Sequence, residues 1–125
     1  MTAAIVTGCD VVDISRVAAV IRRRPDVLNR LFTDREQQDV LRDDVTVDSE
    51  VAAARFAARF AAKEAVRKAL RQRGLAWQAI EVRTANDGAP ILHVNGSPSS
   101  LALSLSHDGG VAFAVVIGFA DATLG

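Results

Sequence analysis

The sequence has few of the features that tie a chain to a membrane or to an oxidising compartment. Cys9 is its single cysteine, so an internal disulfide is excluded and a reducing cytoplasm is the expected location. The first residues, MTAAIVTGCDVVDI, have neither the basic start nor the long apolar run of a signal peptide. Because no apolar stretch approaches the ~20 residues of a membrane-spanning helix, we expect no membrane partner.

The chain also lacks a net charge, because 15 basic residues balance 15 acidic ones. A general nucleic-acid-binding domain is usually strongly basic, so nucleic acid is not an expected partner. The charges are nevertheless segregated: residues 34–50 contain seven acids and two arginines, and residues 55–73 contain seven basic residues and one acid, Glu64. Such runs can steer charged partners, although solvated helix faces explain any one run equally well.

The length and the apolar content suit one compact domain, residues 1–125, since half of the chain is hydrophobic. A short β-rich run at the start predicts a strand that ends near Asp10. Helical spacing of apolar residues then predicts short helices in DISRVAAVIRRR, DVLNRLF and DREQQDVLR. Thr33, with Glu36 three residues later, has the capping-box spacing that starts the third of these helices.

A long helix should follow, with Ser49 as its cap, from about Glu50 to Arg73 and with its end at Gly74. Alternating apolar residues then predict antiparallel strands: AIEVRTA and APILHVN form a hairpin around the turn NDG, and LALSLSH and VAFAVVIGFA follow. A strand, helices and then a sheet indicate an α+β domain, in which an antiparallel sheet packs on one long helix with short N-terminal helices.

Asp10 and Glu64 are candidate metal ligands on chemical grounds. Mg²⁺ in proteins usually takes one or two carboxylates together with phosphate oxygens of a substrate. Lys68 lies four residues after Glu64 on the same helix face, and could act as a point charge on a phosphate. An ordinary explanation also exists for each: Asp10 as a strand-end residue, and Glu64 with Lys68 as a surface ion pair. The spacing alone leaves both interpretations open.

His107 is a third candidate, because it ends an alternating strand just before a glycine-rich turn. A strand-end histidine with local hydrogen bonds would explain it equally well. His93 is assigned no role. Composition and spacing therefore permit a phosphate-handling site without establishing one.

Several motifs together resemble a known family. GCDVVDISRV at the start, RFAARFAAKEAVRKAL in the long helix and SLSHD near the end occur in the order and at the positions typical of holo-acyl-carrier-protein synthases. FTDRE is similar to the start of that family's second helix. These proteins are small 4′-phosphopantetheinyl transferases, and the resemblance, which covers most of the chain, implies their fold.

The resemblance also implies a reaction. The family transfers the 4′-phosphopantetheine group of coenzyme A to a serine of an apo acyl carrier protein or carrier domain, releases adenosine 3′,5′-bisphosphate and requires Mg²⁺. By this resemblance Asp10 and Glu64 would hold the Mg²⁺. Glu64 and Lys68 would be the catalytic residues, with Glu64 a candidate base for the attacking serine.

The resemblance further implies residues that bind the two substrates. The expected coenzyme A residues are Arg59, Lys63, Lys68, Gly88, Pro90 and His107, and helix packing is the alternative role for Arg59 and Lys63. Arg16 would contact the acidic carrier protein, and Arg22, Arg23 and Arg24 would extend that basic patch.

Small members of the family are usually homotrimers whose sites are shared between neighbouring subunits. Asp10 would then come from one chain and Glu64 with Lys68 from the next, or the reverse. The sequence departs from the family at Ala89, where a basic residue is common, and at residues 96–100, which replace an amphipathic helix. Two alternatives to an active transferase stay open: an impaired module on the same fold that binds carrier protein or coenzyme A, and a structural oligomerisation domain.

Overall fold

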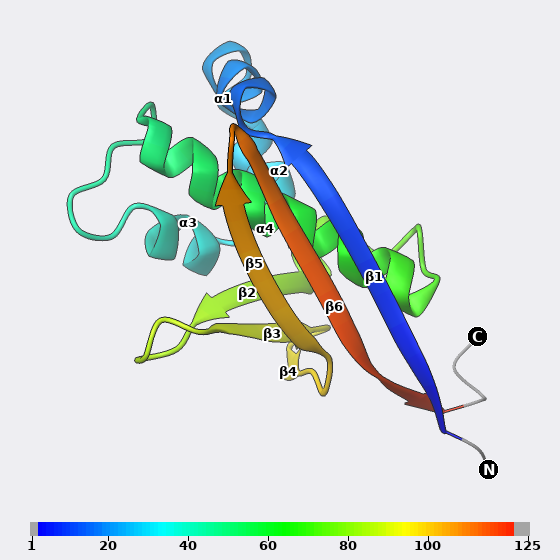
Figure 1. Ribbon diagram of the computed structural model, residues 1–125. Coiled ribbons are helices and arrows are strands. Elements are labelled where there is room, and N and C mark those ends of the chain that lie inside the picture. The colour runs from blue at the N-terminus through cyan, green and yellow to red at the C-terminus, as the bar shows by residue number, and fades with distance from the viewer. Residues whose placement is uncertain (1–2, 122–125) are drawn as a thin grey trace.

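The computed structural model describes residues 3–121, which form two antiparallel sheets and one long helix (Figure 1). The α+β class expected from the sequence is confirmed. The helices are α1 (Ile14–Arg23), α2 (Val27–Leu31), α3 (Asp34–Val40) and α4 (Glu50–Leu70), with a short 3-10 turn η1 (Trp77–Ala79). The strands are β1 (Ala3–Asp13), β2 (Ile80–Thr84), β3 (Pro90–Val94), β4 (Ser97–Pro98), β5 (Ala102–Asp108) and β6 (Val111–Asp121).

The first sheet has the order β1-β6-β5, so the two ends of the described chain lie side by side in it (Figure 1). β1 pairs with β6 along its whole length, from Ala3 opposite Asp121 to Asp13 opposite Val111. β1 is thus three residues longer than predicted, because pairing with β6 continues beyond Asp10. The strands after α4 also divide between two sheets, since β2 and β3 form a second sheet with β4.

α4 lies against one face of the first sheet at very short range (Figure 1). A Cβ atom added to Gly8 would lie 2.2 Å from the carbonyl oxygen of Ala65, so only glycine lets β1 come this close to the helix. Ala58 and Ala61 of the same helix are buried in clusters with Ala112 and Ala114 of β6. These small side chains give α4 a face on which another backbone can pack closely, and this packing fixes the position of β1 against α4.

The helix starts follow the signals in the sequence. Thr33 Oγ1 accepts a hydrogen bond from the Glu36 N–H, and Glu36 Oε1 accepts one from the Thr33 N–H, which together form the predicted capping box of α3. Ser49 Oγ accepts the Ala52 N–H at 3.1 Å and caps α4 as expected. Local side chains alone therefore fix where α3 and α4 begin.

The end of α4 differs from the prediction. The helix ends at Leu70, because Arg71 takes the left-handed conformation with φ 55° and ends the helical run before Gly74. Arginine thereby occupies a position where glycine is the usual residue. No helix within residues 3–121 is both long enough and apolar enough to cross a bilayer.

The second sheet, β2-β3-β4, contains the predicted hairpin and one short additional strand. β4 pairs with His93 and Val94, so the segment GSPSS is more than the turn that was expected. β2 forms the other edge of this sheet, and α3 lies along that edge. This contact joins the short helices to the second sheet.

Candidate functional site

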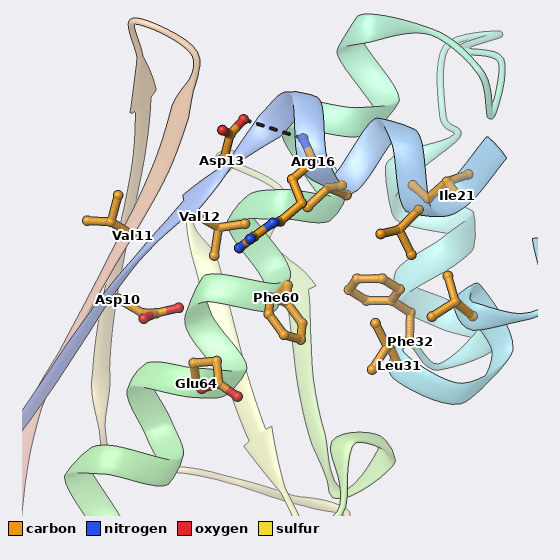
Figure 2. Close-up of a pocket in the computed structure, with 13 residues that line it drawn as sticks. Asp10, Val11, Val12, Asp13, Arg16, Ile21, Leu31, Phe32, Phe60 and Glu64 are labelled. Atoms are coloured by element: carbon orange, nitrogen blue, oxygen red, sulfur yellow. Dashed lines mark hydrogen bonds between the residues drawn. The ribbon is translucent and has the colours of Figure 1, made fainter. Parts of the chain in front are cut away.

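Asp10 and Glu64 line one cavity of about 460 Å³ between β1, α1, α2 and α4, which we name the carboxylate cavity (Figure 2). Asp10 comes from β1 and Glu64 from the facing helix α4, and their side chains are 20% and 30% exposed. Strand alternation places Asp10 on the same side of β1 as Gly8, the side that contacts α4. The close packing at Gly8 therefore holds the two carboxylates at one place.

Lys68 joins this pair from the next turn of α4. Its Nζ lies 3.1 Å from Asp10 Oδ1 and donates to the Cys9 carbonyl oxygen at 2.8 Å. All three predicted residues thus meet within a single chain. The expected division of Asp10 and Lys68 between two subunits is corrected by this contact, because β1 packs on α4 of its own chain.

The donor set suits Mg²⁺ completed by a substrate. Residues 3–121 contain no cluster of three or more aspartate, glutamate, histidine or cysteine side chains that could hold a metal ion. Two carboxylates are too few for a structural metal site, but they match Mg²⁺, which keeps water ligands and binds substrate phosphates. Asp10 and Glu64 could hold the ion in this way, with Lys68 beside them.

The rest of the carboxylate cavity is mostly apolar and has Arg16 on its wall (Figure 2). Its apolar lining comes from Val12, Val17, Val20, Ile21, Val27, Leu31, Phe32 and Phe60. Arg16 is held at the start of α1 by Asp13, whose Oδ1 accepts the Ser15 hydroxyl at 2.7 Å and the Arg16 N–H at 3.4 Å. The Ser15 hydrogen bond is the largest cause that lowers the pKa of Asp13.

The four arginines predicted to contact a carrier protein do not share one surface. Arg16 and Arg23 lie seven residues apart in α1, and therefore on one face of that helix. Arg22 lines a different cavity, which it shares with Asp48 and Glu50. Arg24 follows the end of α1 and is exposed. The helix geometry thus separates Arg22 from Arg16.

A strongly basic cavity of about 870 Å³ continues from Glu64 along the end of α4. It is lined by Glu64, Arg67, Lys68, Arg71 and Arg73. The Arg67 guanidinium donates to the Leu75 carbonyl oxygen and lies 3.3 Å from the centre of the Trp77 ring. Arg67 is therefore fixed in place, whereas Lys68 is 53% exposed and can reach a ligand.

Four of the six predicted coenzyme A residues gather in a separate place, which we name the anion cavity. Arg59, Gly88, Pro90 and His107 all line this cavity of about 300 Å³. Arg42, Arg55, Thr84 and Ser106 line it as well, and the sequence analysis did not assign them a role. Three arginines and a histidine face the cavity, and none of the described residues that line it is acidic. Its chemistry suits an anion such as a phosphate.

Arg59 is the most buried charged residue of the anion cavity, at 6% exposure. Its Nη2 donates to Thr84 Oγ1 at 3.2 Å, but its Nε has no hydrogen-bond partner among residues 3–121. Burial lowers the pKa of Arg59, although nearby Glu36 and Asp39 oppose this effect. A buried donor without an acceptor is unfavourable, so an anion that supplied one would bind favourably here.

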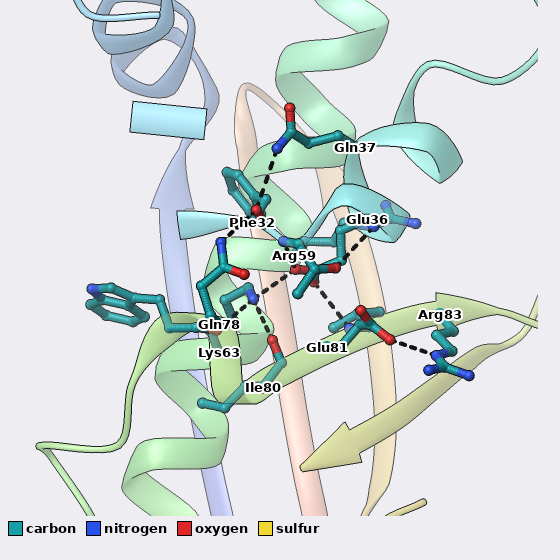
Figure 3. A network of polar contacts seen from close by, with 12 residues as sticks. Phe32, Glu36, Gln37, Arg59, Lys63, Gln78, Ile80, Glu81 and Arg83 are labelled. Carbon is teal, nitrogen blue, oxygen red and sulfur yellow. Dashed lines mark hydrogen bonds and ion pairs between the residues drawn. The ribbon is translucent and has the colours of Figure 1, made fainter. Parts of the chain in front are cut away.

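Lys63 lines neither the carboxylate cavity nor the anion cavity. Its predicted role in coenzyme A binding is therefore corrected. Its side chain is fully buried, with Nζ 2.7 Å from Glu36 Oε1 (Figure 3). Burial lowers the pKa of Lys63, and the Glu36 carboxylate opposes that shift. The alternative that the sequence left open, a role in packing, fits this position because a ligand cannot reach the ammonium group.

The carboxylate and anion cavities have no residue in common. At 3.6 residues per turn, Arg55 and Arg59 point to the opposite side of α4 from Glu64. The basic cavity shares Glu64 with the carboxylate cavity and shares no lining residue with the anion cavity. One chain therefore carries two separate cavities on opposite sides of α4.

Several known proteins are similar to this chain in sequence and in fold. The 4′-phosphopantetheinyl transferase superfamily matches residues 7–118. A holo-[acyl-carrier-protein] synthase of Frankia alni is 42% identical over 88% of this chain and 92% of that protein, and one of Salinispora arenicola is 39% identical over 90% and 96%. The resemblance noted from the motifs is confirmed by these matches.

Solved structures agree. The Helicobacter pylori holo-[acyl-carrier-protein] synthase in complex with coenzyme A superposes with a TM-score of 0.71 and 28% identity, over 90% of this chain and 99% of that one. The Mycobacterium tuberculosis acyl carrier protein synthase superposes with a TM-score of 0.68 and 31% identity, over 91% and 96%. From its sequence and its fold alike, this chain belongs to the 4′-phosphopantetheinyl transferase superfamily, with the holo-[acyl-carrier-protein] synthases.

Proposed function

We propose that this protein transfers the 4′-phosphopantetheine group of coenzyme A to a serine of an apo acyl carrier protein or carrier domain, with Mg²⁺ as its metal. Adenosine 3′,5′-bisphosphate would be the other product. The observation that carries this proposal is the grouping of the residues: Asp10, Glu64 and Lys68 meet on one side of α4, and Arg59 and His107 line a cavity on the other side.

The carboxylate cavity would perform the transfer. Asp10 and Glu64 would hold Mg²⁺, which when bound neutralises the charge of a pyrophosphate and of its leaving group. Lys68 would bind the pyrophosphate as a point charge, since its ammonium is half exposed and adjoins Asp10. Glu64 is the candidate general base for the attacking serine, because its carboxylate is partly exposed on the cavity wall.

The anion cavity would bind the 3′-phosphate end of coenzyme A. Arg59 supplies an Nε that has no partner among residues 3–121, and His107, Gly88 and Pro90 complete the wall. The family's common basic residue is absent at Ala89, but Arg42 lines the same cavity from the segment after α3. The substitution at Ala89 therefore leaves the cavity strongly basic.

The uncovered face of the first sheet supports assembly into a homotrimer. Figure 1 shows that α4 covers only one face of β1, β6 and β5. On the opposite face, Ile5 lies opposite Phe119 and Val11 lies opposite Phe113, and all four are exposed. An apolar surface of this kind is typical of a protein–protein interface. Assembly would bring the anion cavity of one subunit to the carboxylate cavity of its neighbour.

Arg16 and Arg23 would contact the acidic carrier protein on the exposed face of α1. The apolar cavity beneath Arg16 could receive an apolar side chain of that partner (Figure 2). Arg22 would contribute less, because it lines a different cavity that already contains acidic side chains. We expect the reaction to take place in the cytoplasm, where coenzyme A and apo carrier proteins are both present.

The test is intact-protein mass spectrometry of an apo acyl carrier protein after incubation with this protein, coenzyme A and Mg²⁺. We expect a gain of one phosphopantetheine that EDTA prevents. Binding of coenzyme A without any gain, for several different carriers, would favour the impaired-module alternative. Absence of both binding and transfer would favour a structural oligomerisation domain.

A further inference from the structure

The buried ion pair of Lys63 and Glu36 is a polar feature that the proposed reaction does not use (Figure 3). Both side chains are fully buried, and Lys63 Nζ also donates to the carbonyl oxygens of Trp77, at 2.8 Å, and of Ile80. An ammonium group has three protons, and three protein oxygens accept them here. Lys63 is therefore saturated by its own chain and acts on structure, not on a ligand.

The pair holds the outer edge of β2. In the antiparallel ladder with β3, alternate residues of β2 point their backbone groups away from β3, and these are Ile80, Val82 and Thr84. On that edge, Lys63 Nζ donates to the carbonyl oxygen of Ile80, and Glu36 Oε2 accepts a hydrogen bond from the Val82 N–H at 3.0 Å. These two buried side chains thereby satisfy backbone groups that stay unpaired at an ordinary sheet edge.

Thr84 connects this edge to the anion cavity. Its N–H donates to Asp39 Oδ2 at 3.3 Å, one helical turn of α3 beyond Glu36. Its hydroxyl accepts Arg59 Nη2 at 3.2 Å and lies 3.5 Å from Arg42 Nη1. The direction of two guanidinium groups in the cavity thus depends on where β2 is held against α3 and α4.

We propose that Lys63 and Glu36 are positioning residues of the anion cavity, which fix Thr84 and Arg59 by holding the edge of β2. The proposal rests on the coenzyme A site proposed above. Apolar residues of similar volume often stabilise a core at least as well as a buried ion pair. A contribution to stability alone therefore does not explain the pair, whereas alignment of the side chains in the anion cavity does.

The experiment uses the double variant Glu36→Gln with Lys63→Met, which removes both buried charges at nearly constant volume. Leu28→Ala is the matched control, because Leu28 is buried in α2, is distant in sequence from β2 and lines none of the described cavities. For each protein we would measure the melting temperature, the Kd of adenosine 3′,5′-bisphosphate by calorimetry without metal, and the NMR signal of the Arg59 Nε–H.

We expect the double variant to fold, to bind the bisphosphate at least about tenfold more weakly, and to show a more mobile Arg59. The control should keep the wild-type affinity and Arg59 signal even where its melting temperature falls. An unchanged affinity in the double variant would overturn the proposal. Equal losses of affinity in both variants would also overturn it, because they would follow from stability alone.

Two further outcomes are informative. If the wild-type protein does not bind the bisphosphate, the proposed coenzyme A site is wrong, and the NMR signal of Arg59 alone tests the positioning role of Lys63 and Glu36. An Arg59 that is mobile in the double variant but ordered in the Leu28→Ala protein then supports that role. An Arg59 that is ordered in both proteins refutes it. Should the double variant not fold, Glu36→Gln alone keeps an acceptor for Lys63, and the same measurements and criteria apply to it.

Discussion

Lys68 Nζ lies 3.1 Å from Asp10 Oδ1, although 58 positions separate the two residues in the chain. The Lys68 side chain is 53% exposed, and ion pairs this exposed contribute little to stability. The contact matters because it brings a carboxylate of β1 and a cation of α4 to one place on the surface. Mutations here should consequently affect activity much more than folding.

Glu64→Gln should abolish the transfer while the protein stays folded. The change removes the proposed metal ligand and candidate base at nearly constant volume, so we expect kcat to fall by at least about 100-fold. The melting temperature should stay close to that of the wild type, because Glu64 is partly exposed and its one ion pair within residues 3–121 is a 3.8 Å contact with Arg67. Glu50→Gln, an exposed change on the same helix, is the control. A fully active Glu64→Gln protein would contradict the metal assignment.

Arg16→Ala should raise the KM for the carrier protein by several-fold and leave the KM for coenzyme A nearly unchanged. Arg16 lines the carboxylate cavity from α1, whereas the anion cavity lies on the other side of α4. Added salt should reduce the difference, since it screens exposed charges. Arg22→Ala is the matched control and should have a smaller effect, because Arg22 lines a different cavity. Equal changes in both KM values would argue against a docking role.

Ile117→Glu should disrupt assembly of the protein. Ile117 is 51% exposed on the uncovered face of the first sheet, and a charge there would have to be desolvated in an interface. Sedimentation velocity should show a smaller species than the wild type, with loss of activity at the same concentration. Ile91→Glu, at a 42% exposed isoleucine of β3 in the other sheet, should sediment as the wild type does. No change in either variant would remove the interface from this face.

The Asp13 cap should make the start of α1 dependent on pH. Hydrogen bonding, first of all from Ser15, lowers the pKa of Asp13 in the folded protein below its ordinary value. A carboxylate with a lowered pKa stabilises the fold above that ordinary value, and the contribution is lost as the pH falls through the folded pKa.

Asp13→Ala should therefore lower the melting temperature at pH 7 by a margin that shrinks at acidic pH. Thermal unfolding of both proteins between pH 7 and pH 3 would check this. Asp13→Asn is the control, because asparagine caps helices without titrating. A difference between wild type and Asp13→Ala that does not depend on pH would show that the carboxylate charge is irrelevant.

The features that the sequence predicted well are those set by neighbours along the chain. The capping box of Thr33 and Glu36 and the Ser49 cap were found from spacing, because the groups that they satisfy lie within three residues. Arg55 could have been added to the anion cavity by the same reasoning, since it lies one helical turn before Arg59. The motifs also pointed to Asp10, Glu64 and Lys68, which the structure brings to one place.

The features that the sequence could not give depend on contacts between distant segments. Lys63 and Arg59 lie four residues apart in one basic helix, yet one is saturated by buried oxygens and the other lines a cavity. That difference arises where α3 and β2 meet α4. The early end of α4 was missed for another reason, because Arg71 adopts a backbone conformation that arginine rarely takes.

The separation of the carboxylate and anion cavities on opposite sides of α4 has a genetic consequence if the proposed assembly holds. A chain defective at Glu64 still carries an intact anion cavity, and a chain defective at Arg59 still carries an intact carboxylate cavity. Co-expression of two such inactive alleles would give mixed assemblies. In these, some interfaces would contain an intact anion cavity from one chain and an intact carboxylate cavity from the other. The two alleles should then complement each other and restore part of the activity, whereas two alleles altered in the same cavity should not.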